Sequence, residues 1–447
     1  MESELRKNDD AAHGGDNRVS VSKTGLLWNS IGSTMLALST VVLSYFTIHV
    51  VGAEDGGLMS LALTVAQVFG FIGYFETRNY QNSEGGEGFS FAAFRSLKRM
   101  LLACNLLAVA VYTLLTGVTV YHMEILALMG VYRALDGYAD LYESELQHRG
   151  KLAYTGASQF FRSFLSILLY AVLLLVTRNM LLAAAAACGF AVLSALVLAL
   201  IAPRLTGDAQ TAQGADAADS AGMPASGEDD ASAADRTAHK ASVRALFFEC
   251  LPVAAGMILW ALILSISRIA VGHLMTDADT ARYQVLFLPI NFFALLVNYV
   301  YRPFLPQMGV WHRDGDEESL RKLMKRSAFF LVLLTAAVAV GGYLLGPWFL
   351  GLISGLDLNA DRLLFAFLML AGGLSGIAIM LYYVLIVQRK QKRILICYVL
   401  SALVAILCAY LLTAHFGLTG AAVSFFLATL VLLIAFFAAL RQGSDAR

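Results

Sequence analysis

The sequence has 447 residues, of which 58% are hydrophobic and only 14% are charged. Soluble domains average about 45–50% apolar and about 25% charged residues, so this composition excludes an ordinary soluble protein. The formal net charge is zero, with 32 basic and 32 acidic side chains, so no global field favours nucleic acid as a partner. We therefore expect an integral membrane protein embedded in the lipid bilayer.

Apolar residues gather in blocks of about 20, the length of helix that crosses a hydrocarbon core about 30 Å thick. Twelve such blocks leave little chain for a soluble domain, and the expected fold class is an all-α polytopic membrane protein. The predicted spans are 24–48, 56–76, 100–120, 122–143, 157–177, 180–201, 246–272, 282–302, 327–349, 362–386, 394–414 and 417–440.

The spans fall into two six-helix bundles, at 24–201 and 246–440, between a 1–23 N-terminal segment and a 441–447 tail. The bundles are joined by 202–245. Its central part, 206–240, is rich in Ala, Asp, Gly and Ser and cannot bury enough apolar surface to offset its ordering entropy. We expect a disordered cytoplasmic linker there. The basic stretch 320–326 predicts a short amphipathic helix on the inner leaflet.

The distribution of Lys and Arg predicts the orientation of the spans. Of the 32 basic residues, 26 fall in the N-terminal segment and the loops on the same side as it, and 3 fall on the opposite side (Arg178, Arg282 and Arg362). Cytoplasmic loops carry the excess of Lys and Arg, so both termini are expected in the cytoplasm. The first 23 residues are polar, and we expect no cleavable signal peptide.

The two halves show weak internal similarity. Each has a Val-Gly pair at the end of its first span, an acidic turn, and a second span that ends in Tyr and Arg. Arg78 and Arg302 thereby fill equivalent places, at an offset of 224. An even number of spans in each half gives repeats of the same orientation, which favours alternating access around a cleft between two bundles.

The span at 122–143 is unusually polar. Arg133, Asp136, Asp140 and Glu143 lie on one helical stripe. An ionisable group at mid-membrane costs at least about 2.5–3.5 kcal/mol, so lipid exposure is excluded. Two interpretations remain: an Arg133–Asp136 ion pair with the other two acids in cytoplasmic water, or a stripe that faces a water-filled central cavity.

Two further arginines lie inside spans. Arg162 is near the cytoplasmic end of its span, where its side chain can snorkel to the interface. Arg268 is deeper and has no acidic neighbour one helical turn away. One interpretation is that its guanidinium, which cannot deprotonate, binds phosphate oxygens. The other is that its side chain snorkels to the outer headgroups.

Patterns of catalytic chemistry are missing from the sequence. There is no Walker-type glycine loop, no H-E-x-x-H pattern and no nucleophile elbow, and the 8 histidines form no ligand cluster. The 5 cysteines lie inside apolar blocks without C-x-x-C spacing and are expected to act as buried hydrophobes. We expect a non-enzyme with no catalytic residues, no bound metal and no cofactor.

Four short motifs carry a family resemblance: Trp28-Asn29-Ser30-Ile31-Gly32-Ser33, Gly52-Ala53-Glu54-Asp55-Gly56-Gly57, Arg78-Asn79-Tyr80-Gln81 and Gln147-His148-Arg149-Gly150-Lys151-Leu152. With them the sequence resembles the polysaccharide-biosynthesis flippases of O-antigen and capsule type, within the MATE-like exporter superfamily. The resemblance covers nearly the whole chain. The Ala- and Asp-rich linker has no counterpart in the family pattern.

The resemblance implies a flippase of the cell membrane. Its cargo would be an undecaprenyl-diphosphate-linked oligosaccharide, moved from the inner to the outer leaflet for surface polysaccharide assembly, with a polysaccharide polymerase and glycosyltransferases as further partners. The family motifs do not assign the residues of its cationic cavity. From position alone we select Arg133, Arg162 and Arg268 for the cavity, and Arg78 and Arg302 as headgroup contacts at the cytoplasmic mouth.

Other functions remain open at this point. A MATE-type drug or metabolite antiporter, coupled to H⁺ or Na⁺, would share the fold and could use Asp136 or Asp140 as its coupling carboxylate. The acids cluster towards the cytoplasmic side, which favours the flippase. The predicted outer loops are short, which argues against a polysaccharide polymerase, and a purely structural scaffold would not need the polar stripe.

Overall fold

The computed structural model describes residues 23–82, 88–116, 119–206 and 229–441. All regular structure in these ranges is helical. The helices are α2 (Lys23–Val51), α3 (Ala53–Tyr74), α4 (Thr77–Gln81), α5 (Phe91–Thr116), α6 (Val120–His148), α7 (Leu152–Thr177), α8 (Met180–Thr206), α10 (Asp229–Leu274), α11 (Asp277–Phe287), α12 (Ile290–Arg313), α13 (Glu317–Ser354), η2 (Asn359–Asp361), α14 (Arg362–Val387) and α15 (Gln391–Arg441).

The number of membrane spans agrees with the sequence. Within the described ranges, ten helical segments are long and apolar enough to cross a membrane. The polar helix α6 is not among them, although its 29 residues pack lengthwise between α3 and α8. Helix α15 is counted once, but Gly417 breaks it with a φ of 58°. The Ser401 hydroxyl donates to the Ala428 carbonyl at 2.8 Å, so the two halves lie side by side. With α6 included and α15 divided, twelve spans result, as predicted.

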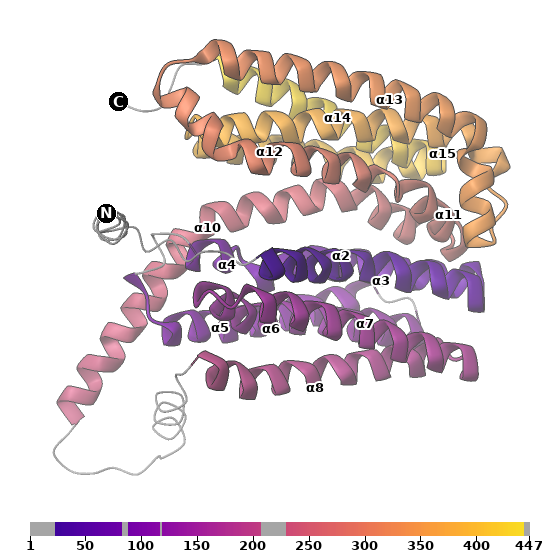
Figure 1. Ribbon diagram of the computed structural model, residues 1–447. Coiled ribbons are helices and arrows are strands. Elements are labelled where there is room, and N and C mark those ends of the chain that lie inside the picture. Colours follow the sequence, from indigo (N-terminus) through magenta and orange to yellow (C-terminus); the bar gives the residue numbers. More distant parts are fainter. Residues whose placement is uncertain (1–22, 83–87, 117–118, 207–228, 442–447) are drawn as a thin grey trace, which may run out of the picture.

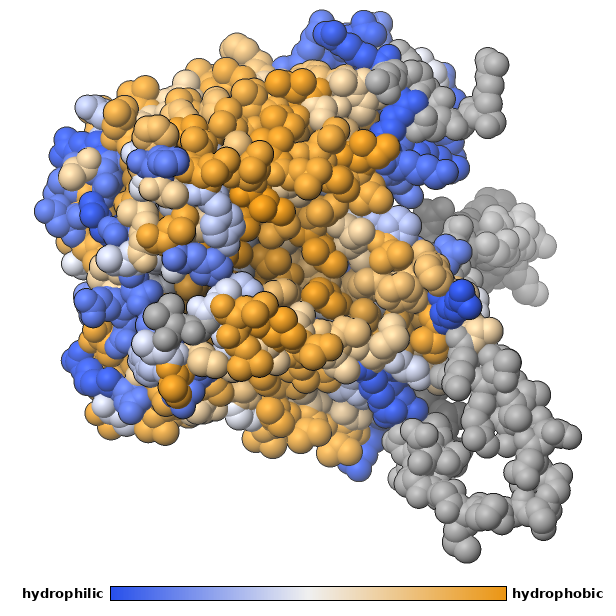
Figure 2. All heavy atoms as spheres, turned by 180° about the vertical axis from the view of Figure 1, so that it is seen from behind, coloured by the Kyte–Doolittle hydropathy of each residue, from blue (hydrophilic) through white to orange (hydrophobic). Residues whose placement is uncertain are grey.

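The helices form two lobes, which we call the N-lobe (α2–α8) and the C-lobe (α10–α15) (Figure 1). Each lobe contributes six spans, because α11 and α12 share one span and α15 supplies two. Each lobe has its own hydrophobic core, centred on residues such as Met59 and Tyr170 in the N-lobe and Tyr301 and Leu381 in the C-lobe. Figure 2 shows a broad band of hydrophobic residues with hydrophilic residues at both ends, as expected of a membrane protein.

The described chain begins and ends at the same end of the molecule, which we call the basic end (Figure 1). A Cβ on Gly25 would lie 3.5 Å from the side chain of Leu152. The Lys151 ammonium contacts the Leu205 carbonyl, and the Lys390 ammonium donates to the Leu440 carbonyl at 3.2 Å. An even number of spans requires this arrangement. That the basic end faces the cytoplasm stays a prediction from the charge asymmetry.

The lobes contact each other at both ends. At the basic end the packing is apolar: Phe247 of α10 stacks on Phe75 with ring centres 5.1 Å apart, and Cys250 is buried in the same hydrophobic cluster.

At the opposite end the contacts are polar and close. A Cβ on Gly57 of α3 would overlap the main-chain carbonyl of Asp277 on α11, so only glycine allows this approach. The imidazole Nε2 of His122 lies 3.0 Å from the carboxylate of Asp277. The Tyr112 hydroxyl lies 2.7 Å from Nε2 of His273. In this structure the lobes are therefore in direct polar contact at the end away from the basic loops.

Three expected boundaries were wrong. Helix α5 begins at Phe91 rather than near residue 100, so its basic first turns belong to the helix. Helix α10 begins at Asp229, within the stretch expected to be disordered, because extending an existing helix through Ala-rich sequence needs no new nucleation. The rest of that linker, 207–228, lies outside the described residues. The stretch 320–326 is part of α13 rather than a separate helix, and Asp316 caps the start of α13 by accepting from the Ser319 amide at 3.0 Å.

Local breaks distinguish the two halves. The expected span 282–302 is interrupted between the end of α11 at Phe287 and the start of α12 at Ile290. Pro289 lies in this gap, and because proline has no amide hydrogen it cannot continue the hydrogen bonds of α11. Arg78 lies in the short helix α4 after Phe75 and Glu76, both of left-handed conformation. Arg302 lies inside the continuous helix α12. The two arginines that the internal similarity pairs therefore have different local structures.

Candidate functional site

The polar stripe of α6 is buried in the N-lobe. Arg133, Asp136, Asp140 and Glu143 are only 7%, 2%, 4% and 1% exposed. The helix is continuous from Val120 to His148, so its period keeps all four on one face. That face is covered by side chains from neighbouring helices, so the stripe avoids lipid as predicted. The interpretation in which the stripe faces a water-filled central cavity was wrong, because only Asp140 of these four described residues lines a pocket.

Asp136 joins two arginines. Its Oδ2 accepts from Nη1 of Arg133 at 2.9 Å, the ion pair expected from their spacing. Its Oδ1 accepts from Nη1 of Arg162 on α7, whose Nη2 also donates to Glu143 at 3.2 Å. Arg162 is 7% exposed, so the expectation that it snorkels to the interface was wrong. Arg133 further contacts the hydroxyl of Thr40 on α2, so partners on two helices, α6 and α2, fix its guanidinium group.

Asp140 and Glu143 are also held by protein groups. Oδ1 of Asp140 lies 3.2 Å from Nη1 of Arg78, and Oδ2 lies 3.3 Å from Nζ of Lys98. The Glu143 carboxylate accepts from the Gln159 amide at 3.0 Å. The interpretation that placed these two acids in cytoplasmic water was wrong, because α6 continues past them and neighbouring helices cover them.

Lys98 is a site residue that sequence reasoning missed. The predicted span began at residue 100, which placed Lys98 in a loop, but the structure places it inside α5 with 1% exposure. Its ammonium contacts the carbonyls of Gly73, Tyr74 and Gly137 at 2.9, 3.1 and 3.0 Å, in addition to Asp140. It therefore joins α3, α5 and α6.

These contacts define a charged cluster of four cations and three carboxylates. Its members are Arg78, Lys98, Arg133, Arg162, Asp136, Asp140 and Glu143. These seven side chains carry one more positive than negative charge. Glu76 lines the adjoining pocket together with Arg78 and Asp140 and adds a further carboxyl group, so the charges of the cluster and its pocket balance.

The charged cluster reaches a pocket at the basic end. The pocket has a volume of about 250 Å³ and is lined by Phe71, Tyr74, Glu76, Arg78, Asn79 and Asp140. The side chain of Arg78 is 22% exposed, and its Nε and Nη2 donate to Gln147 at 3.0 and 2.8 Å. Arg78 therefore presents charge at the pocket while it remains anchored to α6.

Arg268 lies in the other lobe. Its Nη2 donates to the Ser265 hydroxyl at 3.0 Å, and its guanidinium lies 4.7 Å from the ring centre of Phe287. The guanidinium also donates to the Leu264 carbonyl and to Gln284 Oε1, each at 3.4 Å. Ser265 and Leu264 both precede Arg268 in α10, so the side chain points towards the basic end. This direction contradicts snorkelling to the outer headgroups. Within the described residues no ion pair involves Arg268.

The five predicted binding residues are thus only partly brought together. Arg78, Arg133 and Arg162 belong to one charged cluster, whereas no described hydrogen bond or ion pair joins Arg268 to it. The side chain of Arg302 lies outside the described residues. Whether any of these arginines binds a cargo stays a prediction.

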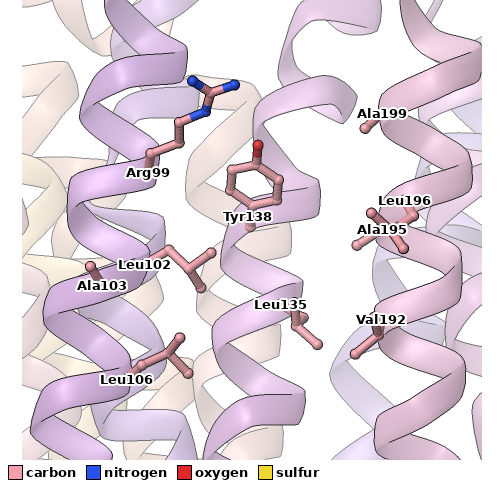
Figure 3. Close-up of a pocket in the computed structure, with 10 residues that line it drawn as sticks. All are labelled: Arg99, Leu102, Ala103, Leu106, Leu135, Tyr138, Val192, Ala195, Leu196 and Ala199. Carbon is pink, nitrogen blue, oxygen red and sulfur yellow. The ribbon is translucent and has the colours of Figure 1, made fainter. Parts of the chain in front are cut away.

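A second pocket lies on another side of α6 (Figure 3). Its volume is about 410 Å³, and it is lined from α5, α6 and α8 by Arg99, Leu102, Ala103, Leu106, Leu135, Tyr138, Val192, Ala195, Leu196 and Ala199. Apart from Arg99 and Tyr138 the lining is apolar. The pocket and the charged cluster are therefore chemically distinct.

Comparison with known proteins identifies the fold. No family model matches the sequence, and no curated protein matches it. A solved structure of the lipid II flippase MurJ in an inward closed conformation is 12% identical, with a TM-score of 0.65, over 93% of this chain and 88% of that chain. An inward-facing multidrug resistance MATE family transporter of the MOP superfamily is 14% identical, with a TM-score of 0.61, over 93% of this chain and 97% of that chain.

A third solved structure has the same fold. The Vibrio cholerae MATE transporter VcmN in the bent form is 16% identical, with a TM-score of 0.54, over 94% of this chain and 97% of that chain. The chain therefore has the fold of MATE and MurJ transporters over nearly its whole length, which confirms the MATE-like fold expected from the sequence motifs.

Proposed function

We propose that this multi-pass membrane protein is a transporter that flips a lipid-linked oligosaccharide across the cell membrane. The cargo is an undecaprenyl-diphosphate-linked glycan that moves from the inner to the outer leaflet for surface polysaccharide assembly. The fold of MATE and MurJ transporters supports transport as the class of activity. The observation that carries the choice of cargo is Arg78, whose partly exposed guanidinium lines the pocket at the basic end beside the charged cluster.

The chemistry of the cargo fits this arrangement. A diphosphate is too polar to cross hydrocarbon unaided, whereas its lipid tail can stay in the bilayer. Guanidinium groups bind phosphate oxygens in two-point fashion and stay charged. Arg78 at the pocket makes the first contact. Arg133 and Arg162 already hold carboxylates, so they bind cargo by exchanging a carboxylate oxygen for a phosphate oxygen.

The arrangement of the lobes suits alternating access. The polar contacts between the lobes, through Gly57 and through His122 with Asp277, lie at the end opposite to the pocket. At the basic end Phe247 of α10 packs on Phe75, so opening of the lobes there requires this apolar contact to separate. Arg268, in the C-lobe, supplies a guanidinium without a carboxylate partner among the described residues. Cargo captured at the basic end would then bridge the N-lobe cluster and Arg268 as the lobes rock.

The alternative is a MATE-type antiporter coupled to H⁺ or Na⁺, which the fold equally allows. Its coupling carboxylate would be Asp136 or Asp140. Both carboxylates hold two cationic partners each, so a coupling ion would have to displace Arg or Lys. Cargo binding to Arg133 and Arg162 has the same requirement, so these ion pairs do not distinguish the two functions. The flippase rests on the resemblance of the sequence motifs, and with it we propose a polysaccharide polymerase and glycosyltransferases as functional partners.

The experiment compares Arg268→Ala with a matched exposed substitution. We expect Arg268→Ala to reduce surface polysaccharide while protein abundance in the membrane stays normal. The control is Lys322→Ala on α13, whose side chain is 74% exposed and pairs with Glu318, and it should export normally. Wild-type polysaccharide in the Arg268→Ala strain would remove this residue from the mechanism.

A further inference from the structure

The surroundings of Lys98 differ from those of an ordinary buried lysine. Its Nζ has four oxygen neighbours: the carbonyls of Gly73, Tyr74 and Gly137 at 2.9–3.1 Å and the Asp140 carboxylate at 3.3 Å. An ammonium has only three protons to donate. At least one of the four oxygens therefore interacts with Nζ through charge alone, without a proton of its own to accept. The four oxygens surround Nζ as ligand oxygens surround a metal cation.

The carbonyls of this shell are set by the backbone rather than by Lys98. Helix α3 ends in the left-handed residues Phe75 and Glu76, which leaves its last carbonyls without helical partners. Gly73 and Gly137 lie back to back, and a Cβ on Gly137 would come within 3.0 Å of the Gly73 backbone. This close approach of α3 and α6 brings main-chain carbonyls of both helices together beside Asp140.

We propose that Lys98 is a tethered cation that occupies a monovalent-cation site formed by three main-chain carbonyls and one carboxylate. Carbonyl shells of this kind replace the hydration shell of K⁺ in channels. Because the lysine fills the site, the native protein exchanges no free cation there. Removal of the side chain leaves a vacant shell that takes K⁺ or NH₄⁺. This inference goes beyond the proposed cargo and does not depend on it.

Asp140 was one of two candidate carboxylates for H⁺ or Na⁺ coupling. With the Lys98 ammonium on one oxygen and Arg78 on the other, it is a fixed counter-charge rather than a site of ion exchange. Lys98 is then a positioning residue that holds the α3–α4 break, and with it Arg78, against α6.

The test uses full-length Lys98→Ala protein, purified and unfolded by heat. Midpoints are measured in choline chloride, NaCl, KCl and NH₄Cl at equal ionic strength. We expect K⁺ or NH₄⁺ to raise the midpoint of Lys98→Ala by about 2 °C or more over choline, while wild type shows no preference among the salts. Adding Asp140→Asn should abolish the response. Lys98→Met, which fills the volume without charge, should not respond either.

Two results would overturn the proposal. One is a thermal unfolding midpoint of Lys98→Ala that is the same in choline, K⁺ and NH₄⁺. This result is expected if Lys98 has only a structural role. The other is a cation response of equal size in wild type, which would place the effect elsewhere. If Lys98→Ala is unstable in choline, the yield of monodisperse protein in each salt replaces the midpoint, and equally low yield in NH₄Cl also counts against the site.

Discussion

The substitution Asp136→Asn tests most sharply whether the charged cluster is a connected unit. The side chain keeps its size but loses its charge, while Arg133 and Arg162 both lose the carboxylate that they share. The excess positive charge of the cluster then rises from one to two. Because α2, α3 and α7 cover the stripe, water cannot readily replace the missing charge.

The expected cost follows from this geometry. Breaking a buried ion pair by removing one partner costs about 3–5 kcal/mol. Arg162 keeps its contact with Glu143 at 3.2 Å, and Arg133 keeps its contact with Thr40. These remaining contacts place the expected loss of stability near the lower limit, at about 3 kcal/mol.

The assay is reversible unfolding in mixed detergent micelles, followed by intrinsic fluorescence. Glu318→Gln is the matched control, because it removes a carboxylate from an ion pair of 2.7 Å whose side chains are 74% and 76% exposed. We expect no measurable change there, since exposed pairs contribute little. Combining Asp136→Asn with Arg162→Leu should cost less than the sum of the single changes, with a coupling energy of about 1–3 kcal/mol.

A small or additive loss of stability would contradict a buried, connected cluster. A loss of less than about 1 kcal/mol for Asp136→Asn would mean that solvent reaches the cluster and screens it. Additive losses for Asp136→Asn and Arg162→Leu would mean that their contact contributes nothing, despite its burial.

Three further predictions concern other parts of the molecule. Arg268→Lys should restore less surface polysaccharide than wild type, because an ammonium cannot bind two phosphate oxygens at once; full export would contradict two-point binding. Gly57→Val should hold α3 away from α11, so that a cysteine in place of Asp277 reacts faster with a membrane-impermeant thiol reagent; unchanged labelling would contradict the close contact. Hydrogen bonds from the side chain and backbone of Ser319 lower the pKa of Asp316, so its stabilising cap on α13 is complete above the ordinary carboxylate pKa and is lost as pH falls through the lowered value. Amide exchange at the start of α13 should increase over that acidic range, and the same profile in Asp316→Ala would contradict the role of the carboxylate.

The spans could be predicted from the sequence because hydrocarbon thickness fixes helix length. The boundaries were less predictable. The start of α5 was missed because Arg95, Lys98 and Arg99 lower its hydropathy, although Phe94, Leu97 and Leu101 already follow a helical period. The helical first turns of α10 were missed because low hydrophobicity was equated with disorder.

The candidate site shows which contacts sequence can predict. The Arg133–Asp136 pair follows from a spacing within one helix and was expected. The contacts of Asp136 with Arg162 and of Asp140 with Lys98 join different helices, and no spacing within a helix encodes them. The oxygens around Lys98 are mostly main-chain carbonyls, which have no signature in side-chain identity.

Deletion of this protein from cells would show whether it moves a lipid-linked glycan to the outer leaflet. Cells without the protein should accumulate a complete undecaprenyl-diphosphate-linked repeat unit on the inner leaflet, and re-expression of wild type should clear it. Normal levels of that intermediate on both leaflets, with surface polysaccharide intact, would contradict the proposed function.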